Sequence, residues 1–168
     1  LEGGAAVCPQ IRAIVQAGIP VVGHLGLTPQ AIHALGGFKV QGKAPEARTQ
    51  MMEDALRLKD AGVSMLVLEM VPASLAAEIT AMLDIPTIGI GAGVQCDGQV
   101  LVCNDLLGFD LSFAPRFLKR YAELESQMVK AIQQYVREVG ESVFPGPEHA
   151  FGPANRRAKP DETLSKLY

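Results

Sequence analysis

One carboxylate occupies a position in this sequence where charge is unusual. Glu69 is the only charged residue in the apolar run Met65–Val71. Burying a carboxylate costs several kcal/mol unless it is paired or protonated, so a lone acid in such a run needs an explanation. One explanation is a general base that removes a proton from a substrate. The other is a structural residue that forms a salt bridge at the rim of a sheet, and the pattern alone favours neither.

Two more polar residues lie beside apolar segments and suit the binding of metal ions or anions. Glu2 precedes the pair Gly3–Gly4, and its carboxylate oxygens are the type of ligand that Mg²⁺ prefers. A solvated residue at the chain end is the simpler interpretation of Glu2 considered alone. His24 lies in the apolar segment Ile19–Leu27 and could bind a substrate carboxylate or a metal-bound water. Lone histidines in such segments are more often core residues with satisfied hydrogen bonds.

A glycine-rich segment and a polar loop are further candidates for substrate contacts. Gly89–Gly93 reads GIGAG and could fold into a backbone nest for an anion, but it lacks the third glycine of the dinucleotide-binding pattern. Close packing of the backbone explains the same glycines. Lys39 and Gln41 lie in the segment GGFKVQGK, which is either a substrate-covering loop or a solvated one.

Short apolar runs alternate with longer amphipathic stretches, which predicts βαβ units and a parallel sheet. The predicted strands are residues 19–25, 64–71, 85–91 and 99–103, and a fifth strand ends near residue 1. The predicted helices are residues 6–17, 45–61, 73–83 and 115–139, with a short helix beginning at residues 28–29. In a (β/α)8 barrel the active site lies at the carboxyl ends of the strands. Glu2, His24 and Glu69 are all predicted to lie there.

Composition limits the classes of protein to which this chain can belong. The 168-residue chain is 48% hydrophobic and 20% charged and has no tryptophan, so one domain with an aliphatic core is expected. A net charge of -3 without a basic stripe argues against nucleic-acid binding. No apolar run approaches the roughly 20 residues of a membrane-spanning helix, and no signal peptide is visible, so a cytoplasmic protein is expected. The three cysteines lack metal-ligand spacing.

Six segments of the sequence, taken in order, form a distinctive set of motifs. They are GHLGLTPQ at 23–30, GGFKVQGK at 36–43, LVLEMVP at 66–72, IPTIGIGAG at 85–93, DGQVLV at 97–102 and FPGPEHAF at 144–151. Together they resemble the ketopantoate hydroxymethyltransferase (3-methyl-2-oxobutanoate hydroxymethyltransferase) family. The resemblance extends from Leu1 to about Phe151, several of its motifs are eight or nine residues long, and a chance match across all six is not expected.

The resemblance implies an α/β fold, a (β/α)8 TIM barrel of the phosphoenolpyruvate/pyruvate superfamily, of which this chain would hold the C-terminal portion with about five strands. It implies a homo-oligomer, usually a decamer, that transfers a hydroxymethyl group from 5,10-methylenetetrahydrofolate to 3-methyl-2-oxobutanoate. The product is 2-dehydropantoate, on the route to pantothenate and coenzyme A. The implied metal is Mg²⁺, which would stabilise the enolate of the oxo acid. Residues 1–151 would belong to one barrel domain and residues 152–168 to a polar, mobile tail.

By motif, Glu69 matches the family's catalytic base, His24 an active-site histidine near the substrate, and Glu2 a carboxylate of the Mg²⁺ environment. The family's two metal-site aspartates, its substrate-binding serine and its substrate-binding lysine are expected before Leu1. Five strands cannot close a barrel and leave a sheet edge exposed, so the chain is expected to be inactive by itself. Two alternatives remain: a related 2-oxo-acid lyase, and a non-catalytic fragment that pairs with an N-terminal partner.

Overall fold

The computed structural model describes residues 1–31 and 37–152 of the 168-residue chain. The chain forms two compact units, residues 1–122 and residues 123–168. The expectation of one barrel domain over residues 1–151 stays a prediction. The predicted tail, residues 152–168, lies outside the described residues except for Gly152.

The first unit contains a parallel four-stranded sheet whose strands follow the order of the sequence. The strands are β1 (Val22–Gly26), β2 (Met65–Glu69), β3 (Thr87–Ile90) and β4 (Gly98–Gln99). Each strand pairs in parallel with the next. On the other side of β1, Glu2 forms a single parallel bridge with His24. The predicted strand near the start of the chain is therefore reduced to one bridged residue.

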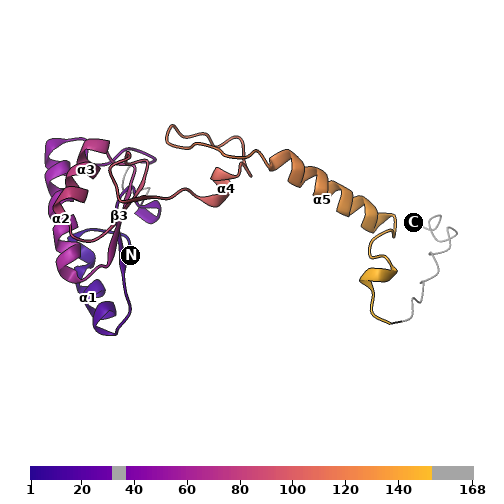
Figure 1. Cartoon of the computed structure of the whole chain (residues 1–168), viewed down its shortest axis with the longest axis horizontal. Coiled ribbons are helices and arrows are strands. Elements are labelled where there is room, and N and C mark those ends of the chain that lie inside the picture. The colour runs from indigo at the N-terminus through magenta and orange to yellow at the C-terminus, as the bar shows by residue number, and fades with distance from the viewer. Residues whose placement is uncertain (32–36, 153–168) are drawn as a thin grey trace, which may run out of the picture. The chain divides into compact units, whose positions relative to one another are not determined.

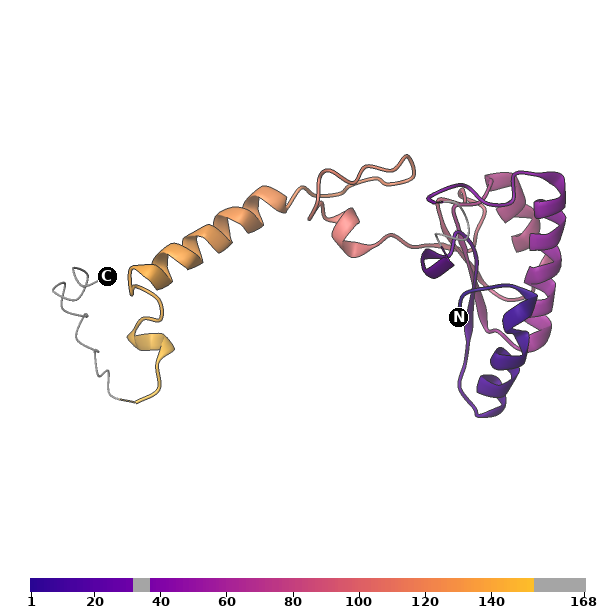
Figure 2. The same ribbon diagram turned by 180° about the vertical axis from the view of Figure 1, so that it is seen from behind.

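Helices cover one face of this sheet (Figure 1). The 3₁₀ turn η1 (Ala5–Val7) leads into α1 (Cys8–Gln16), while α2 (Pro45–Ala61) and α3 (Ala73–Met82) follow β1 and β2 along the chain. Seen from behind, the same helices again lie together on one side of the strands (Figure 2). The unit therefore has an α/β fold, as the sequence predicts.

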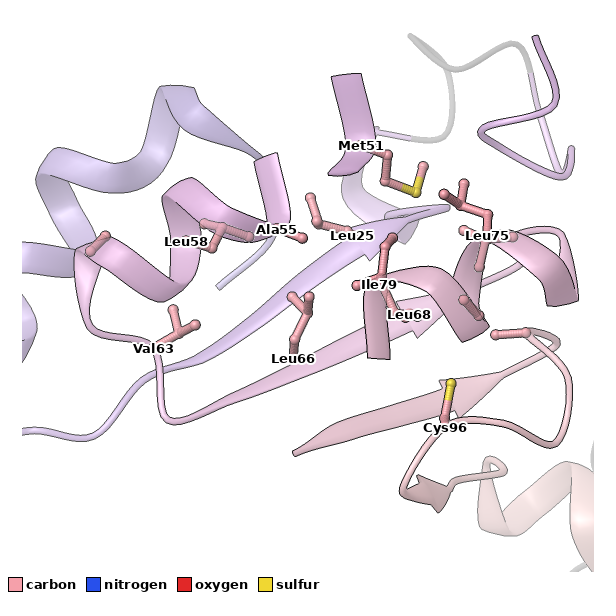
Figure 3. Close-up of a cluster of buried hydrophobic side chains, with 14 of the residues drawn as sticks. Leu25, Met51, Ala55, Leu58, Val63, Leu66, Leu68, Leu75, Ile79 and Cys96 are labelled. Atoms are coloured by element: carbon pink, nitrogen blue, oxygen red, sulfur yellow. The ribbon is translucent and has the colours of Figure 1, made fainter. Parts of the chain in front are cut away.

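The core lies between the helices and the strands and consists of aliphatic and sulfur-containing side chains. Leu25, Leu66 and Leu68 point from the strands toward the helices (Figure 3). Their partners on α2 and α3 are Ala55, Leu58, Leu75 and Ile79. No aromatic side chain belongs to this cluster within the described part of the chain. Because successive strand residues point to opposite faces, His24 and Glu69 alternate with the buried leucines and face away from the helices.

The predicted strand over residues 99–103 is wrong over most of its length. β4 ends at Gln99, and Cys103 begins the short helix α4 (Cys103–Leu106). The N–H of Val100 still donates to the carbonyl of Gly89, but β3 itself ends at Ile90. The ladder thus stops one residue before β3 ends, and the apolar run that follows Gln99 does not extend the sheet.

The predicted helix over residues 115–139 begins only at residue 125. Helix α5 spans Glu125–Gly140. Before it, the Arg120 guanidinium donates to the carbonyls of Leu111 and Phe113. The N–H of Tyr121 donates to the carbonyl of Leu106. These tertiary hydrogen bonds hold residues 111–121 as a loop and outweigh the local preference for a helix.

The second unit is described over residues 123–152. After α5, the chain turns through η3 (Pro147–His149), and the ring of Phe144 contacts those of Tyr135 and His149, with centroid distances of 5.5 and 5.1 Å. Several apolar side chains of α5 are exposed, namely Val129, Ile132, Val136 and Val139. None of the described helices has both the length and the apolar character of a membrane span.

Candidate active site

Glu2, His24 and Glu69, which the sequence predicts as site residues, meet at the carboxyl edge of the sheet. In the β1–β2 ladder His24 pairs with Val67, and Gly26 pairs with Glu69. The side chains of His24 and Glu69 therefore project from the same face of the sheet, on neighbouring strands, with Glu69 one pleat nearer the carboxyl edge. Glu2 approaches His24 from the opposite side through its backbone bridge.

The imidazole of His24 has a carboxylate beside each of its nitrogens. Nδ1 is 3.8 Å from Oε1 of Glu2, and Nε2 is 3.3 Å from Oε2 of Glu69. The side chains of His24 and Glu69 are only 16% and 18% exposed, so the Glu69 carboxyl faces the imidazole rather than bulk solvent. Nε2 is nevertheless buried without a well-directed hydrogen bond to any described residue. Both contacts are ion pairs only when the imidazole is protonated.

Backbone hydrogen bonds fix the chain on both sides of Glu69. Its carbonyl accepts the N–H of Leu27 at 2.8 Å, and the N–H of Met70 donates to the carbonyl of Ile90 at 2.8 Å. Met70 has a φ of 51°, in the left-handed region that non-glycine residues rarely adopt. The chain therefore turns sharply directly after the carboxylate. Backbone strain of this kind clusters at functional sites.

The turn that follows β1 is attached to both glutamates. The N–H of Leu27 reaches the Glu69 carbonyl, and the N–H of Gln30 donates to Oε2 of Glu2 at 3.3 Å. Thr28 lies between these two attachments and is only 8% exposed. The sequence indicated Thr28 only as the first residue of a short helix. Its position directly after a strand is the signal that could have linked it to the site.

Two hollows at this edge share His24 and Thr28 in their walls. The larger, of about 690 Å³, is also lined by Glu2 and Val67. The smaller, of about 320 Å³, extends toward Gln41 on the polar loop. Both volumes fall within the range of roughly 300–1,000 Å³ that is typical of small-molecule sites.

Glu2 fits as one ligand of a hard metal ion, but the described residues do not form a complete metal site. No group of three or more His, Cys, Asp or Glu side chains in residues 1–31 and 37–152 is arranged around a common point. Mg²⁺ is commonly bound through one or two carboxylates, with water and substrate oxygens as the other ligands. The Glu2 carboxylate lines the larger hollow and can contribute in this way.

The glycine-rich segment lies beside Glu69, because Ile90 pairs with Glu69 in the β2–β3 ladder. A Cβ added at Gly93 would lie 2.5 Å from the Cβ of Ala73, and one at Gly91 would lie 3.2 Å from the ring of Phe117. These close approaches support the packing interpretation of the GIGAG motif. In the polar loop, Gln41 lines the smaller hollow, and its N–H donates to the carbonyl of Met70, while Lys39 is exposed.

A half-buried carboxylate beside an imidazole can move a proton, and an adjacent second carboxylate can hold a cation. This chemistry suits both the transferase and the lyase alternatives. The model of the ketopantoate hydroxymethyltransferase family matches residues 1–147. The chain belongs to the ketopantoate hydroxymethyltransferase family.

Three relatives in this family are each named 3-methyl-2-oxobutanoate hydroxymethyltransferase. The protein of Oleidesulfovibrio alaskensis is 56% identical over 98% of this chain and 57% of its own length. That of Heliobacterium modesticaldum is 57% identical over 90% of this chain and 55% of its own length. That of Clostridium botulinum is 55% identical over 100% of this chain and 59% of its own length. The chain thus spans little more than half the length of these relatives.

Proposed function

We propose that the protein transfers a hydroxymethyl group to the branched 2-oxo acid 3-methyl-2-oxobutanoate, with Glu69 as the base. The supporting observation is the Glu69 carboxyl, held 3.3 Å from His24 in a member of this family. The proposed donor is 5,10-methylenetetrahydrofolate, and the product is 2-dehydropantoate, a precursor of pantothenate. We also propose that the parallel sheet is the C-terminal part of a (β/α)8 barrel.

The Glu69 carboxylate would remove the proton from C3 of the oxo acid, the carbon next to the ketone. The resulting enolate would then form the new carbon–carbon bond with the one-carbon unit of the donor. Both carbon–nitrogen bonds of that unit would break to leave tetrahydrofolate, and water would supply the oxygen of the new hydroxyl group. Because backbone hydrogen bonds hold Leu27 and Met70 in place, the base needs little reorganisation when the substrate binds. Its low exposure also limits competition from water.

His24 and Glu2 would orient the substrate against this base. The imidazole can donate a hydrogen bond to a carboxylate or keto oxygen of the oxo acid. The Glu2 carboxylate would be one ligand of the Mg²⁺ ion. When bound, this ion would supply Lewis-acid polarisation of the keto oxygen. The absence of a complete ligand set among the described residues means that further ligands must come from the substrate, from water or from other residues.

The decisive experiment follows exchange of the C3 hydrogen of 3-methyl-2-oxobutanoate with deuterium in heavy water, by proton NMR and without the folate donor. In the full-length protein with Mg²⁺, Glu69→Gln should slow this exchange by at least about 100-fold, since general-base catalysis contributes that much. Binding of the oxo acid should be largely kept because the amide has the same shape.

Glu53→Gln is the matched control. Glu53 pairs with Arg57 on the exposed side of α2, so its loss should leave the exchange rate unchanged. If Glu69→Gln exchanges hydrogen as fast as the unaltered protein, the base is another group. If the unaltered protein neither binds the oxo acid nor exchanges its C3 hydrogen, the proposed function itself is wrong.

The remaining expectations from the family resemblance stay predictions. They are the cytoplasmic location, the absence of nucleic-acid and membrane partners, and the homo-oligomer, which is expected to be a decamer. The non-catalytic fragment also stays open as an alternative, because the chain spans 57% of the Oleidesulfovibrio relative.

A further inference from the structure

Asp54 attaches the chain before α1 to helix α2. Its Oδ1 accepts the backbone N–H of Ala5 at 3.0 Å, across 49 positions of the sequence. The side-chain amide of Gln50, one turn earlier on α2, donates to the same oxygen at 3.2 Å. The next residue of α2, Ala55, is fully buried in the core. The N–H of Ala5 is therefore attached to a helix that is itself packed against the sheet.

The Asp54 carboxyl group also lies directly against the backbone of Gly4. A Cβ placed on Gly4 would overlap the carbon and both oxygens of this carboxyl group. Gly3, the residue before it, has a φ of +119°, a conformation that favours glycine. Because glycine is the residue with the greatest conformational freedom, a turn built on two of them needs outside contacts to hold one conformation. Asp54 supplies such a contact.

The glycine pair joins the Asp54 contact to Glu2. On the other side of the pair, the N–H of Gly3 donates to the carbonyl of His24 at 3.2 Å, and Glu2 forms its bridge with His24. Gly3 lines both hollows, whereas Glu2 lines the larger and Asp54 the smaller. Within residues 1–31 and 37–152, Asp54 and Glu2 do not belong to a common group of three or more potential metal ligands. Asp54 can therefore influence a cation at Glu2 through the backbone, not as a ligand.

We propose that Asp54 is a positioning residue that holds the Glu2 carboxylate at the larger hollow and thereby sets the affinity of the site for a divalent cation. This inference rests on the proposed function, because it takes Glu2 as a metal ligand. Without the bond to Ala5, the glycine turn gains conformations in which the carboxylate points elsewhere, and the apparent affinity falls with the fraction that remains competent. A role as a cap of the helical turn alone would lower stability and leave the cation affinity unchanged.

Mn²⁺ serves as the probe of cation affinity, because electron paramagnetic resonance measures the free ion directly and no substrate is needed. In the full-length protein, Asp54→Ala should weaken Mn²⁺ binding by about tenfold or more, as is common when the support of a metal ligand is lost. Asp54→Asn should weaken it by less than about threefold, because the side-chain carbonyl of asparagine can still accept the N–H of Ala5.

Asp97→Ala is the matched control. Asp97 also accepts a backbone N–H, that of Thr87 at 2.8 Å, at the start of β3 and not beside Glu2. Both alanine variants should therefore lose stability in thermal unfolding, but Asp97→Ala should bind Mn²⁺ as tightly as the unaltered protein. In Asp54→Ala the C3 exchange rate at saturating Mg²⁺ and oxo acid should stay within about threefold, because the base itself is unchanged.

Three results would each contradict the proposal. If Asp54→Ala binds Mn²⁺ as tightly as the unaltered protein, Asp54 only caps the turn. If Asp97→Ala loses as much affinity, the cause is general destabilisation. If Asp54→Asn loses as much as Asp54→Ala, the cause is the charge and not the bond to Ala5.

Glu2→Gln separates these results from a failure of the proposed function. If the unaltered protein binds no Mn²⁺, or if Glu2→Gln binds it equally well, Glu2 is not a metal ligand. The proposed metal site and this inference are then both wrong, whereas the role of Glu69 is still decided by the exchange experiment.

Discussion

At the residue scale, the imidazole of His24 lies between two carboxylates that can each accept its hydrogen. Its Nδ1 faces Glu2 and its Nε2 faces Glu69. A neutral imidazole carries its hydrogen on one nitrogen only, so it can donate toward one glutamate at a time. The choice of nitrogen therefore decides toward which glutamate the imidazole can donate. A substrate oxygen that binds one nitrogen would change the partner of the other.

Asp97 offers a residue-scale prediction about acid stability. The backbone N–H of Thr87 donates to Asp97 Oδ2 at 2.8 Å and the Thr87 hydroxyl at 3.1 Å, and these bonds hold the pKa of the Asp97 carboxyl below its usual value. A lowered folded-state pKa stabilises the fold at pH values above the unfolded pKa of roughly 3.9. That stabilisation is lost as the pH falls through the folded pKa.

Asp97→Asn should therefore lower the free energy of unfolding at neutral pH, and the difference from the unaltered protein should shrink as the pH falls below about 4. Urea unfolding at a series of pH values measures this difference. Thr87→Val is the companion variant, because it removes the hydroxyl donor and keeps the backbone donor, so a smaller pH-dependent loss is expected. A difference for Asp97→Asn that stays constant from neutral to acid pH would contradict the argument.

The sequence could identify some site residues and not others for a physical reason. Glu69 and His24 stand out because each is a lone polar residue in an apolar strand segment, and alternation places both on the open face. Thr28 gives no such contrast, since a threonine before proline is an ordinary start to a helical turn. The contact that ties this turn to the site, from the N–H of Gln30 to Glu2, joins residues 28 positions apart.

At the element scale, the sequence predicted the ends of an element correctly where those ends depend on residues next to them in the chain. Helix α2 begins at Pro45 and stops before Gly62, and both residues act through the backbone alone. Residues 115–124 depend instead on the hydrogen bonds from Arg120 to the carbonyls of Leu111 and Phe113. Such long-range partners carry no signal within a short window of sequence.

Gly26 provides an element-scale prediction about the β1–β2 junction. It has a φ of +99°, and a Cβ there would lie 2.0 Å from the carbonyl oxygen of Glu69. Gly18 has a φ of +81° with no atom within 4 Å of a Cβ, so it isolates the backbone cost. Gly18→Ala should lower the free energy of unfolding by about 1–2 kcal/mol. Gly26→Ala should lower it by about 2–5 kcal/mol, because steric overlap is added.

Urea unfolding followed by circular dichroism compares the two glycine variants under the same conditions. Equal losses would mean that the strands separate easily and that the close approach of Gly26 to Glu69 is not a constraint. If Gly26→Ala loses more stability than Gly18→Ala, it should also slow the C3 exchange reaction. The reason is that the carbonyl displaced by the new Cβ belongs to Glu69, the proposed base.

At the scale of the whole molecule, the sheet has helices on one face and the candidate site on the other. Val22, which shares the open face with His24, is 40% exposed, and the described residues supply one carboxylate for a metal rather than a full set. The 168-residue chain should therefore show no turnover when purified and assayed with Mg²⁺, 5,10-methylenetetrahydrofolate and 3-methyl-2-oxobutanoate. Full turnover would overturn this expectation and would mean that these residues suffice for catalysis.

The aliphatic core also determines how the protein can be observed. Tryptophan is absent from the sequence, and the phenol rings of Tyr121 and Tyr135 are more than half exposed. Intrinsic fluorescence therefore reports little on the packing between sheet and helices. The weak signal is also an advantage, because a single tryptophan introduced beside the candidate site would emit against very low background fluorescence. Its emission would report on that position alone.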